Sequence, residues 1–184
     1  DNGKLKITDS VFLTNNSNHV NGALKVNNGS SYAYLENVDF RGNYANGEGG
    51  AIGNSGFITL KNVVLDSNNA TGLAGAFATT GQTTIFNSTF SNNISKNRAG
   101  ALEVGALVVI YDSSFINNAV TGNGGAIFDR SSLYIVADRN DVIFSGNVKN
   151  ATVSGTLGNY TYTGNDYNDI YVNNLEGINI YLNA

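Results

Sequence analysis

The sequence of 184 residues contains no proline, cysteine, methionine or tryptophan. Without cysteine, no disulfide can hold the chain together, although this absence does not fix the redox compartment, because a long continuous core can replace disulfides. Only 13% of the residues are charged and the formal net charge is -4. A basic surface for nucleic acid or an anionic membrane is therefore not expected. No apolar run is long enough for a membrane-spanning helix.

Glycine and asparagine are abundant instead. The chain has 22 glycines, and about one residue in six is asparagine, so amides replace charges as the main polar groups, which is far from the average composition. The first residues do not form a signal peptide. The chain begins partway through a repeat and has no polar capping segment at its end. Because solenoids need caps, we expect one domain over 1–184 that belongs to a longer chain, or a subunit with covered ends.

One repeated unit accounts for most of the chain. Its key position is an aromatic residue or leucine, and successive copies are 28, 25, 25, 25 and 29 residues apart. An asparagine stands three residues after each copy, and a Gly-Ala pair stands ten residues after each of the first five. A fixed period of roughly 20 to 50 residues predicts a solenoid, propeller or array. The key positions are Phe12, Phe40, Leu65, Phe90, Phe115 and Phe144.

Within each period, apolar residues alternate with polar ones, as Ile58 and Leu60 do, and this pattern predicts strands rather than helices. Clusters of Gly, Asn, Ser and Thr between the strands predict turns. About three short strands in a 25-residue turn are typical of a parallel β-helix. We therefore predict an all-β, single-stranded parallel β-helix of about six to seven coils, right-handed because parallel crossovers nearly always are.

Identical residues stack in columns in such a fold. We expect the asparagines after the key position to form an internal amide ladder, as in stacked in-register sheets. A second column, three residues before the key position, is expected to form an internal ladder of the same kind. The glycine of each Gly-Ala pair is expected to supply a positive φ, and the alanine to fit a crowded interior. The ladder residues are Asn15, Asn43, Asn68, Asn93, Asn118 and Asn147, and the second column is Asp9, Asn37, Asn62, Asn87, Asp112 and Asp141.

The repeat fails in two places, at residues 137–140 and 148–167. Breaks in a solenoid usually correspond to loops on one face, and the longer insertion is expected to be a protruding hairpin or a flap over the coils. Its Tyr160 and Tyr162 are the first candidates for a binding role, because a tyrosine ring offers an apolar face and a hydroxyl. The alternative is that they only pack the insertion onto the helix. Tyr32 and Tyr34 are the second candidates.

The carboxylates do not form an evident catalytic pair. Glycoside hydrolysis needs two carboxyl groups about 5 to 10 Å apart. Asp112 and Asp141 are neighbours in the second column, and stacking in that column accounts for their closeness without a catalytic role. We therefore predict no catalytic residue and no cofactor. We also predict no metal site, because the sequence has no cysteine and no second histidine to bind a transition metal together with His19. Weak calcium binding at 138–141 or 165–169 stays open, although neither segment has the spacing of a known calcium loop.

Seven Asn-x-Ser/Thr sequons occur, and several are expected by chance in this composition. Three of them, at Asn15, Asn87 and Asn93, fall in the stacked columns and are expected to be buried. The remaining four are in predicted turns and are candidates for N-glycosylation. These four are Asn28, Asn69, Asn150 and Asn159.

Two motifs carry a family resemblance. Gly-Gly-Ala-Ile, at 49–52 and 124–127, and the recurring Phe-x-x-Asn are similar to the repeat of chlamydial polymorphic outer membrane proteins. Segments 85–93 and 168–171 resemble still more closely the Asn- and Thr-rich adhesin-like surface proteins of methanogenic archaea. The resemblance implies an extracellular, cell-surface β-helix that acts in adhesion or as a stalk, without enzymatic activity, and whose partner is a host-cell or microbial surface glycan or protein.

Two other functions remain open on the sequence. Parallel β-helices also host polysaccharide lyases and hydrolases, so a carbohydrate-active enzyme is one alternative. The other is a structural subunit that stacks end to end into a filament or envelope layer, because uncapped ends present unpaired edge strands.

Overall fold

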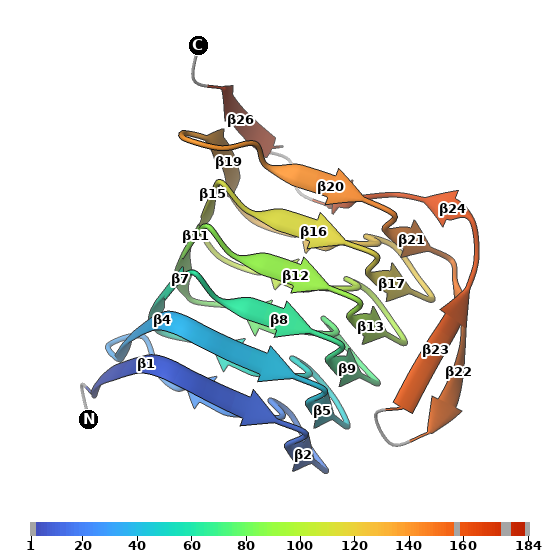
Figure 1. Ribbon diagram of the computed structural model, residues 1–184, viewed down its shortest axis with the longest axis horizontal. Helices are drawn as coiled ribbons and strands as arrows, with labels where there is room; N and C mark the ends of the chain where they lie inside the picture. The colour runs from blue at the N-terminus through green and yellow to red at the C-terminus, as the bar shows by residue number, and fades with distance from the viewer. Residues whose placement is uncertain (1–2, 157–158, 174–177, 183–184) are drawn as a thin grey trace.

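The computed structural model describes residues 3–156, 159–173 and 178–182. Every regular element in this part of the chain is a β-strand, and the strands stack as coils of a parallel β-helix (Figure 1). Stacked partners in the central coils are 25 residues apart, as Asn68 and Asn93 are. The predicted fold class and period are confirmed. Among the described residues, no helix exists that is long and apolar enough to cross a membrane.

Each central coil contributes four strands to three sheets, one strand more than predicted. Sheet 1 receives two consecutive strands, called here the first leg and the second leg. The first leg comprises β7 (Phe57–Lys61), β11 (Gln82–Phe86), β15 (Val108–Tyr111), β19 (Leu133–Ala137) and β26 (Ile178–Leu182). The second leg comprises β8 (Val64–Asp66), β12 (Thr89–Ser91), β16 (Ser114–Ile116) and β20 (Ile143–Ser145), whereas β1 (Lys4–Leu13) and β4 (Tyr32–Arg41) run through both legs.

The other two sheets are narrower. Sheet 2 comprises β2 (Asn16–Ser17), β5 (Tyr44–Ala45), β9 (Asn69–Ala70), β13 (Ile94–Ser95), β17 (Ala119–Val120), β21 (Val148–Lys149) and the antiparallel β24 (Asp166–Tyr167). Sheet 3 comprises β3 (Leu24–Val26), β6 (Ile52–Asn54), β10 (Phe77–Thr79), β14 (Leu102–Val104), β18 (Ile127–Asp129) and β25 (Ile170–Val172). A separate antiparallel pair consists of β22 (Thr152–Thr156) and β23 (Asn159–Thr163).

The second column forms the bend between the two legs, and it is not an internal ladder. Asn37, Asn62 and Asn87 have φ values of 56°, 53° and 45°, a left-handed conformation that asparagine tolerates better than most residues. Their side chains are exposed and stack outside the helix, with Asn62 donating to Asn37 at 3.0 Å and Asn87 to Asn62 at 2.9 Å. The expectation that Asn87 is buried is therefore wrong.

The glycine of each Gly-Ala pair is required for a reason other than the predicted one. The positive φ lies one residue earlier, at Ala74 (55°) and Ala99 (58°). A Cβ on Gly75 would instead lie 2.2 Å from the carbonyl oxygen of Gly100, because the backbones of adjacent coils meet here. The alanines that follow these glycines are fully buried from the second pair onward, as predicted, for example Ala76, whereas Ala23 of the first pair is partly buried.

The core lies between the three sheets and is filled by stacked apolar columns. Phe90 and Phe115 stack with ring centroids 4.7 Å apart, and Phe115 and Phe144 with centroids 5.1 Å apart. Phe90 and Phe115 are fully buried, and each buried aromatic side chain contributes about 1.5 to 3 kcal/mol. This continuous core replaces the disulfides that the composition excludes.

Candidate functional site

The internal asparagine ladder joins every coil from Asn15 to Asn147. In a central coil, Asn93 Nδ2 donates to the backbone oxygen of Leu65 and to Asn118 Oδ1, both at 2.9 Å. Asn93 Oδ1 accepts from the backbone and side-chain nitrogens of Asn68 at 2.9 and 3.1 Å. Asn93 is fully buried, whereas Asn15, in the first coil, is exposed, contrary to expectation. Both polar atoms of each inner amide are paired, so the ladder is structural.

The ladder continues onto a residue that the sequence analysis missed. Asn147 Nδ2 donates to Asp169 Oδ1 at 2.8 Å. Asp169 stands directly before β25 and outside the Phe-x-x-Asn motif. Its position before Ile170 was the only feature of the sequence that could have identified it as a ladder residue. The other acidic residue of segment 165–169, Asp166, accepts from Asn150 at 2.8 Å and lies 3.8 Å from Lys149. Among the described residues, no group of three possible metal ligands occurs.

Asp112 anchors the shorter insertion. Its Oδ1 accepts hydrogen bonds from the backbone N–H groups of Asp138, Arg139 and Asn140, at 2.8, 3.0 and 3.2 Å. Burial alone would raise the pKa of Asp112, but these three donors, helped by the charge of Arg139, hold this pKa below its usual range. The ionised carboxylate therefore fixes a loop, whereas the neighbouring Asp141 is exposed.

We expect this loop to release when Asp112 is protonated. Because the folded pKa is depressed, the anchor is present above the ordinary carboxylate pKa of about 4 and is lost as the pH falls through the lower folded value. An NMR titration should show the amide signals of residues 138–140 shifting together, with a midpoint below that ordinary value. In Asp112→Asn this common transition should vanish, and a wild-type midpoint at or above the ordinary value would contradict the anchor.

The longer insertion folds back over the coils. Strands β22 and β23 form an antiparallel hairpin that leaves the solenoid after β21 and lies along the side formed by sheet 2 (Figure 1). Of the two predicted shapes, the flap is the observed one. Its inner side packs on a small apolar cluster that includes Ile94 and Ala119 of the coils and Val153 of the hairpin. The two hairpin strands and β24, which pairs antiparallel with β21, are thus the described strands that do not follow the repeat.

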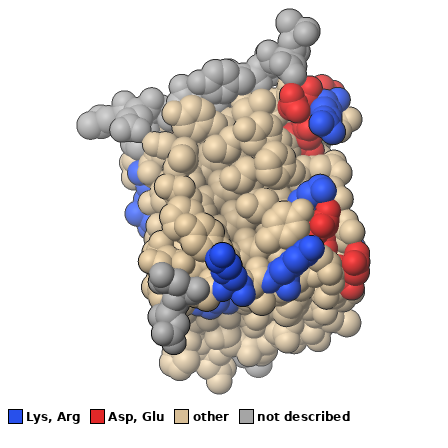
Figure 2. Space-filling view, turned by 90° about the vertical axis from the view of Figure 1, so that its left-hand side faces the viewer, with Lys and Arg blue, Asp and Glu red and all other residues tan. Residues whose placement is uncertain are grey.

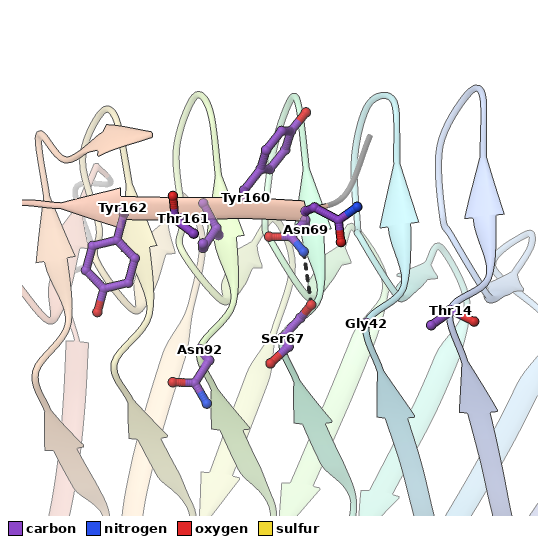
Figure 3. Close-up of a pocket in the computed structure, with 10 residues that line it drawn as sticks. Thr14, Gly42, Ser67, Asn69, Asn92, Tyr160, Thr161 and Tyr162 are labelled. Atoms are coloured by element: carbon purple, nitrogen blue, oxygen red, sulfur yellow. Dashed lines mark hydrogen bonds between the residues drawn. The ribbon is translucent and has the colours of Figure 1, made fainter. Parts of the chain in front are cut away.

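Tyr160 and Tyr162 hold the hairpin onto the coils. The Tyr160 ring meets the edge of Tyr44 with centroids 6.1 Å apart, and Lys96 Nζ lies 4.0 Å from its centre. Tyr162 donates its hydroxyl to the backbone oxygen of Asn117 at 3.4 Å, and burial is the main cause that raises its pKa. The two rings leave β23 in opposite directions (Figure 3). Packing, the alternative role, accounts for these contacts, and a binding role remains a prediction.

A groove of about 500 Å³ lies between β23 and the coils (Figure 3). Its roof is part of β23, and its floor is the column where the second leg turns into sheet 2. This turn column has left-handed backbone in every coil that it crosses, with φ of 57° at Ser67 and 55° at Asn92. The groove is lined by Thr14, Gly42, Ser67, Asn69, Asn92, Ile94, Asn159, Tyr160, Thr161 and Tyr162.

Tyr32 and Tyr34 lie on a different side of the molecule from this groove. Both belong to β4, on the outer side of the first leg of sheet 1. Tyr32 is 51% exposed and stacks on Phe57 with centroids 4.6 Å apart. Lys6 lies 5.8 Å from the centre of the Tyr34 ring. The four predicted tyrosines therefore lie in two separate places.

The structure changes the set of glycosylation candidates. Asn69 is only 4% exposed, and its Nδ2 donates to the backbone oxygen of Ser67 at 3.0 Å, so the expectation that Asn69 lies in an open turn is wrong. The motif is followed by sheet 2 rather than by an open turn, which buries the amide. Asn28, Asn150 and Asn159 are exposed and stay predictions.

Comparison with known families finds one match. Residues 112–129 match the Chlamydia polymorphic membrane protein repeat. The matched segment begins at the bend residue Asp112 and ends with β18, so it covers the second leg, the ladder residue Asn118 and the Gly-Ala pair of one coil. The resemblance to this repeat is supported for that coil. Comparisons with curated proteins and with solved structures give no match.

Proposed function

We propose that this chain is a non-enzymatic segment of a cell-surface protein that acts in adhesion, with its contact site in the groove beneath the hairpin. The repeat match and the β-solenoid fold are compatible with a surface adhesin-like protein. The observation that carries the proposal is the groove itself. It lies where the repeat fails and a non-solenoid element covers the regular coils.

The lining of the groove favours a neutral, hydroxyl-rich ligand. No lining residue carries a formal charge, and most offer an amide or a hydroxyl. Such groups pair with sugar hydroxyls, whereas an acidic polysaccharide or a nucleic acid would be recognised by cationic side chains. Tyr160 and Tyr162 add ring surface and hydroxyl groups, which a sugar ring can contact through its apolar and polar sides. The proposed ligand class is therefore a neutral surface glycan.

The floor of the groove is regular along the solenoid axis. Ser67 and Asn92 occupy equivalent positions in adjacent coils, which are about 4.8 Å apart. Both side chains are held by the same carboxylate, Asp66, to which Ser67 Oγ donates at 3.1 Å and Asn92 Nδ2 at 2.8 Å. A ligand extended along the axis would meet the hydroxyl of Ser67 and the amide of Asn92 in successive coils. This arrangement suits a short stretch of a polymer better than a compact metabolite.

Binding of oligosaccharides tests the proposal. Neutral and acidic oligosaccharides should be titrated against the chain and followed by NMR chemical-shift changes at residues 159–162. We expect neutral oligomers to bind, and Asn159→Ala, which removes a groove amide, to weaken binding by about tenfold, since one hydrogen bond contributes roughly 1 to 1.5 kcal/mol. The control is Thr163→Ala, on the same strand but outside the groove lining.

Three outcomes would count against this function. Binding of acidic oligomers only, or equal loss of affinity in the two variants, would show that the groove is not the site. Reproducible cleavage of any polysaccharide in the same panel would replace adhesion with enzymatic activity. The loop-anchoring role of Asp112 does not favour that alternative, because its Oδ1 already accepts three backbone donors.

A further inference from the structure

An exposed turn joins β3 to β4 and carries an Asn-Gly pair, Asn28 and Gly29. Residues 27–30 of this turn are all exposed. An asparagine that precedes glycine loses its side-chain amide more readily than any other, because glycine has no Cβ to keep its backbone nitrogen away from the asparagine side chain. Whether the reaction proceeds in a folded chain depends on how firmly the pair is held. Four Asn-Gly pairs lie in the described part of the chain, at 21–22, 28–29, 46–47 and 123–124.

The other three pairs are held in the stack of coils. Gly22 N donates to the backbone oxygen of Gly49 at 3.2 Å, and Gly124 N donates to Asn168 Oδ1 at 3.3 Å. A Cβ on Gly47 would lie 2.9 Å from a backbone oxygen of the preceding coil, so this glycine has no room to turn. Each of these nitrogens can reach the asparagine before it only after a local opening of the coils.

The pair at Asn28 is not held in this way. No atom lies within 4 Å of a Cβ built at Gly29, and the backbone nitrogen of Gly29 makes no hydrogen bond within the described part of the chain. The backbone of the turn is closed by a hydrogen bond from Ser31 N to the Asn28 oxygen at 3.3 Å. An exposed hydrogen bond of this kind contributes about 1 kcal/mol, so the turn opens easily. Gly29 N is therefore available as a nucleophile without the unfolding of a coil.

The side-chain amide of Asn28 is polarised toward attack. Its Oδ1 accepts hydrogen bonds from Ser30 N and from Ser31 Oγ, both at 3.1 Å. Donors to a carbonyl oxygen draw electrons from its carbon and stabilise the negative charge that the oxygen acquires when a nucleophile adds. These two groups therefore lower the barrier to addition at Asn28 Cγ.

The surroundings of Asn28 are basic. Figure 2 shows several Lys and Arg side chains near the N-terminal coils, on the side of the molecule that lies on the left in Figure 1. Lys4 and Lys25 line the same hollow of about 360 Å³ as Asn28. Lys25 donates to the hydroxyl of Ser55 at 2.9 Å, and this bond leaves its charge in place. A nearby positive charge favours the deprotonated form of an attacking nitrogen and the negative charge that develops on Oδ1.

We propose that Asn28 deamidates spontaneously in the folded chain. Gly29 N gives up its proton to water or hydroxide and forms a bond to Asn28 Cγ. The bond from Cγ to Nδ2 then breaks, and Nδ2 takes up a proton from water and leaves as ammonia. Water adds to either carbonyl of the resulting five-membered imide and opens the ring, which leaves aspartate or isoaspartate. Overall, water is consumed and ammonia is released in equal amounts, and the reaction requires no oxidant and no cofactor.

The product changes the surface directly before β4. Deamidation adds a negative charge, and isoaspartate also inserts a methylene group into the backbone of the turn. Asn28 is one of the exposed glycosylation candidates, and a glycan would be attached to Nδ2, the atom that deamidation releases. The two modifications therefore exclude each other at this residue. The site is independent of the groove and of the proposed adhesion.

Mass spectrometry of the folded chain, kept at mildly alkaline pH, tests the proposal. Trypsin places the four Asn-Gly pairs in separate peptides, because a lysine or arginine lies between each pair and the next. We expect Asn28 to convert at least about tenfold faster than the other three asparagines in the folded chain, and all four to convert within about threefold of each other in urea. Isoaspartyl methyltransferase detects isoaspartate in the same peptide. Asn37, also in peptide 26–41, precedes valine and should keep its amide.

Gly29→Ala is the matched variant, because its methyl group hinders the approach of the backbone nitrogen and has no other atom within 4 Å. It should slow the conversion of Asn28 by at least about tenfold. Circular dichroism melting checks that the variant is folded, and Gly29→Ser replaces it if it unfolds. The proposal is overturned if the Asn28 amide persists in the folded chain, if all four pairs convert equally there, or if the folded Gly29 variant converts at the wild-type rate.

Discussion

Gly100→Ala is expected to destabilise the folded chain by at least about 3 kcal/mol or to prevent folding. A Cβ at this position would lie 1.9 Å from the carbonyl oxygen of Gly125 and 2.8 Å from the backbone nitrogen of Ala119. Both are backbone atoms, and they belong to the next coil, so no side-chain rotation can relieve the clash. The change in the free energy of unfolding should be measured by urea denaturation followed by circular dichroism.

Gly29→Ala is the matched control for this substitution. No atom lies within 4 Å of a Cβ built at Gly29, and its φ is not in the left-handed region. A methyl group there reduces the freedom of the unfolded chain without strain, so stability should stay within about 1 kcal/mol of wild type, on the more stable side. If both variants melt like the parent, the close approach of the coil backbones at the Gly-Ala pairs is not real.

Asn93→Ala is expected to lower the free energy of unfolding by about 3 kcal/mol, which is the second large effect. The substitution removes four buried hydrogen bonds, so that the backbone oxygen of Leu65, the backbone and side-chain nitrogens of Asn68 and the side-chain oxygen of Asn118 each lose one. Buried polar groups that lose their partner cost about 1 to 3 kcal/mol each, although relaxation or water entry recovers part of that. Thermal and urea unfolding both measure the loss.

The outer ladder supplies the comparison for Asn93. Asn87 also donates to an asparagine one coil away, but it is exposed, and its backbone is left-handed. Asn87→Gly keeps that backbone conformation accessible and loses only a solvent-exposed hydrogen bond, so we expect a change below about 1 kcal/mol. Equal effects of the two substitutions would mean that burial does not distinguish the two ladders.

The columns of the solenoid were predictable because stacking forces each coil to repeat the same side chain at the same place. The spacing of Phe90, Phe115 and their asparagines was therefore enough to predict the period, the core and the inner ladder. Which side of the sheet a column faces was harder. Asn87 has the same residue type and spacing as an inner ladder residue, and only the left-handed backbone at the bend turns it outward.

The position of the candidate site could be predicted from the sequence, but the groove that forms it could not. The failure of the repeat at 148–167 located the hairpin, since a segment without the period cannot stack as a coil. The groove beneath it could not be predicted, because its floor consists of repeat residues such as Ser67 and Asn92 that look equivalent to others. Asp169 was missed for a related reason, because it joins the ladder from another column.

The contact between Tyr160 and Tyr44 changes how the solenoid can fray. In a stack of coils, each coil normally contacts only its neighbours, so end coils can detach one at a time. The hairpin emerges after β21 near one end of the stack, and its Tyr160 reaches Tyr44 of β5, near the other end. It thus acts as a clasp across several coils, and pulling the N-terminal coils away requires the hairpin to release as well. The first coil, β1 to β3, lies outside this clasp and can detach alone, whereas detaching β5 also requires the contact between Tyr160 and Tyr44 to break.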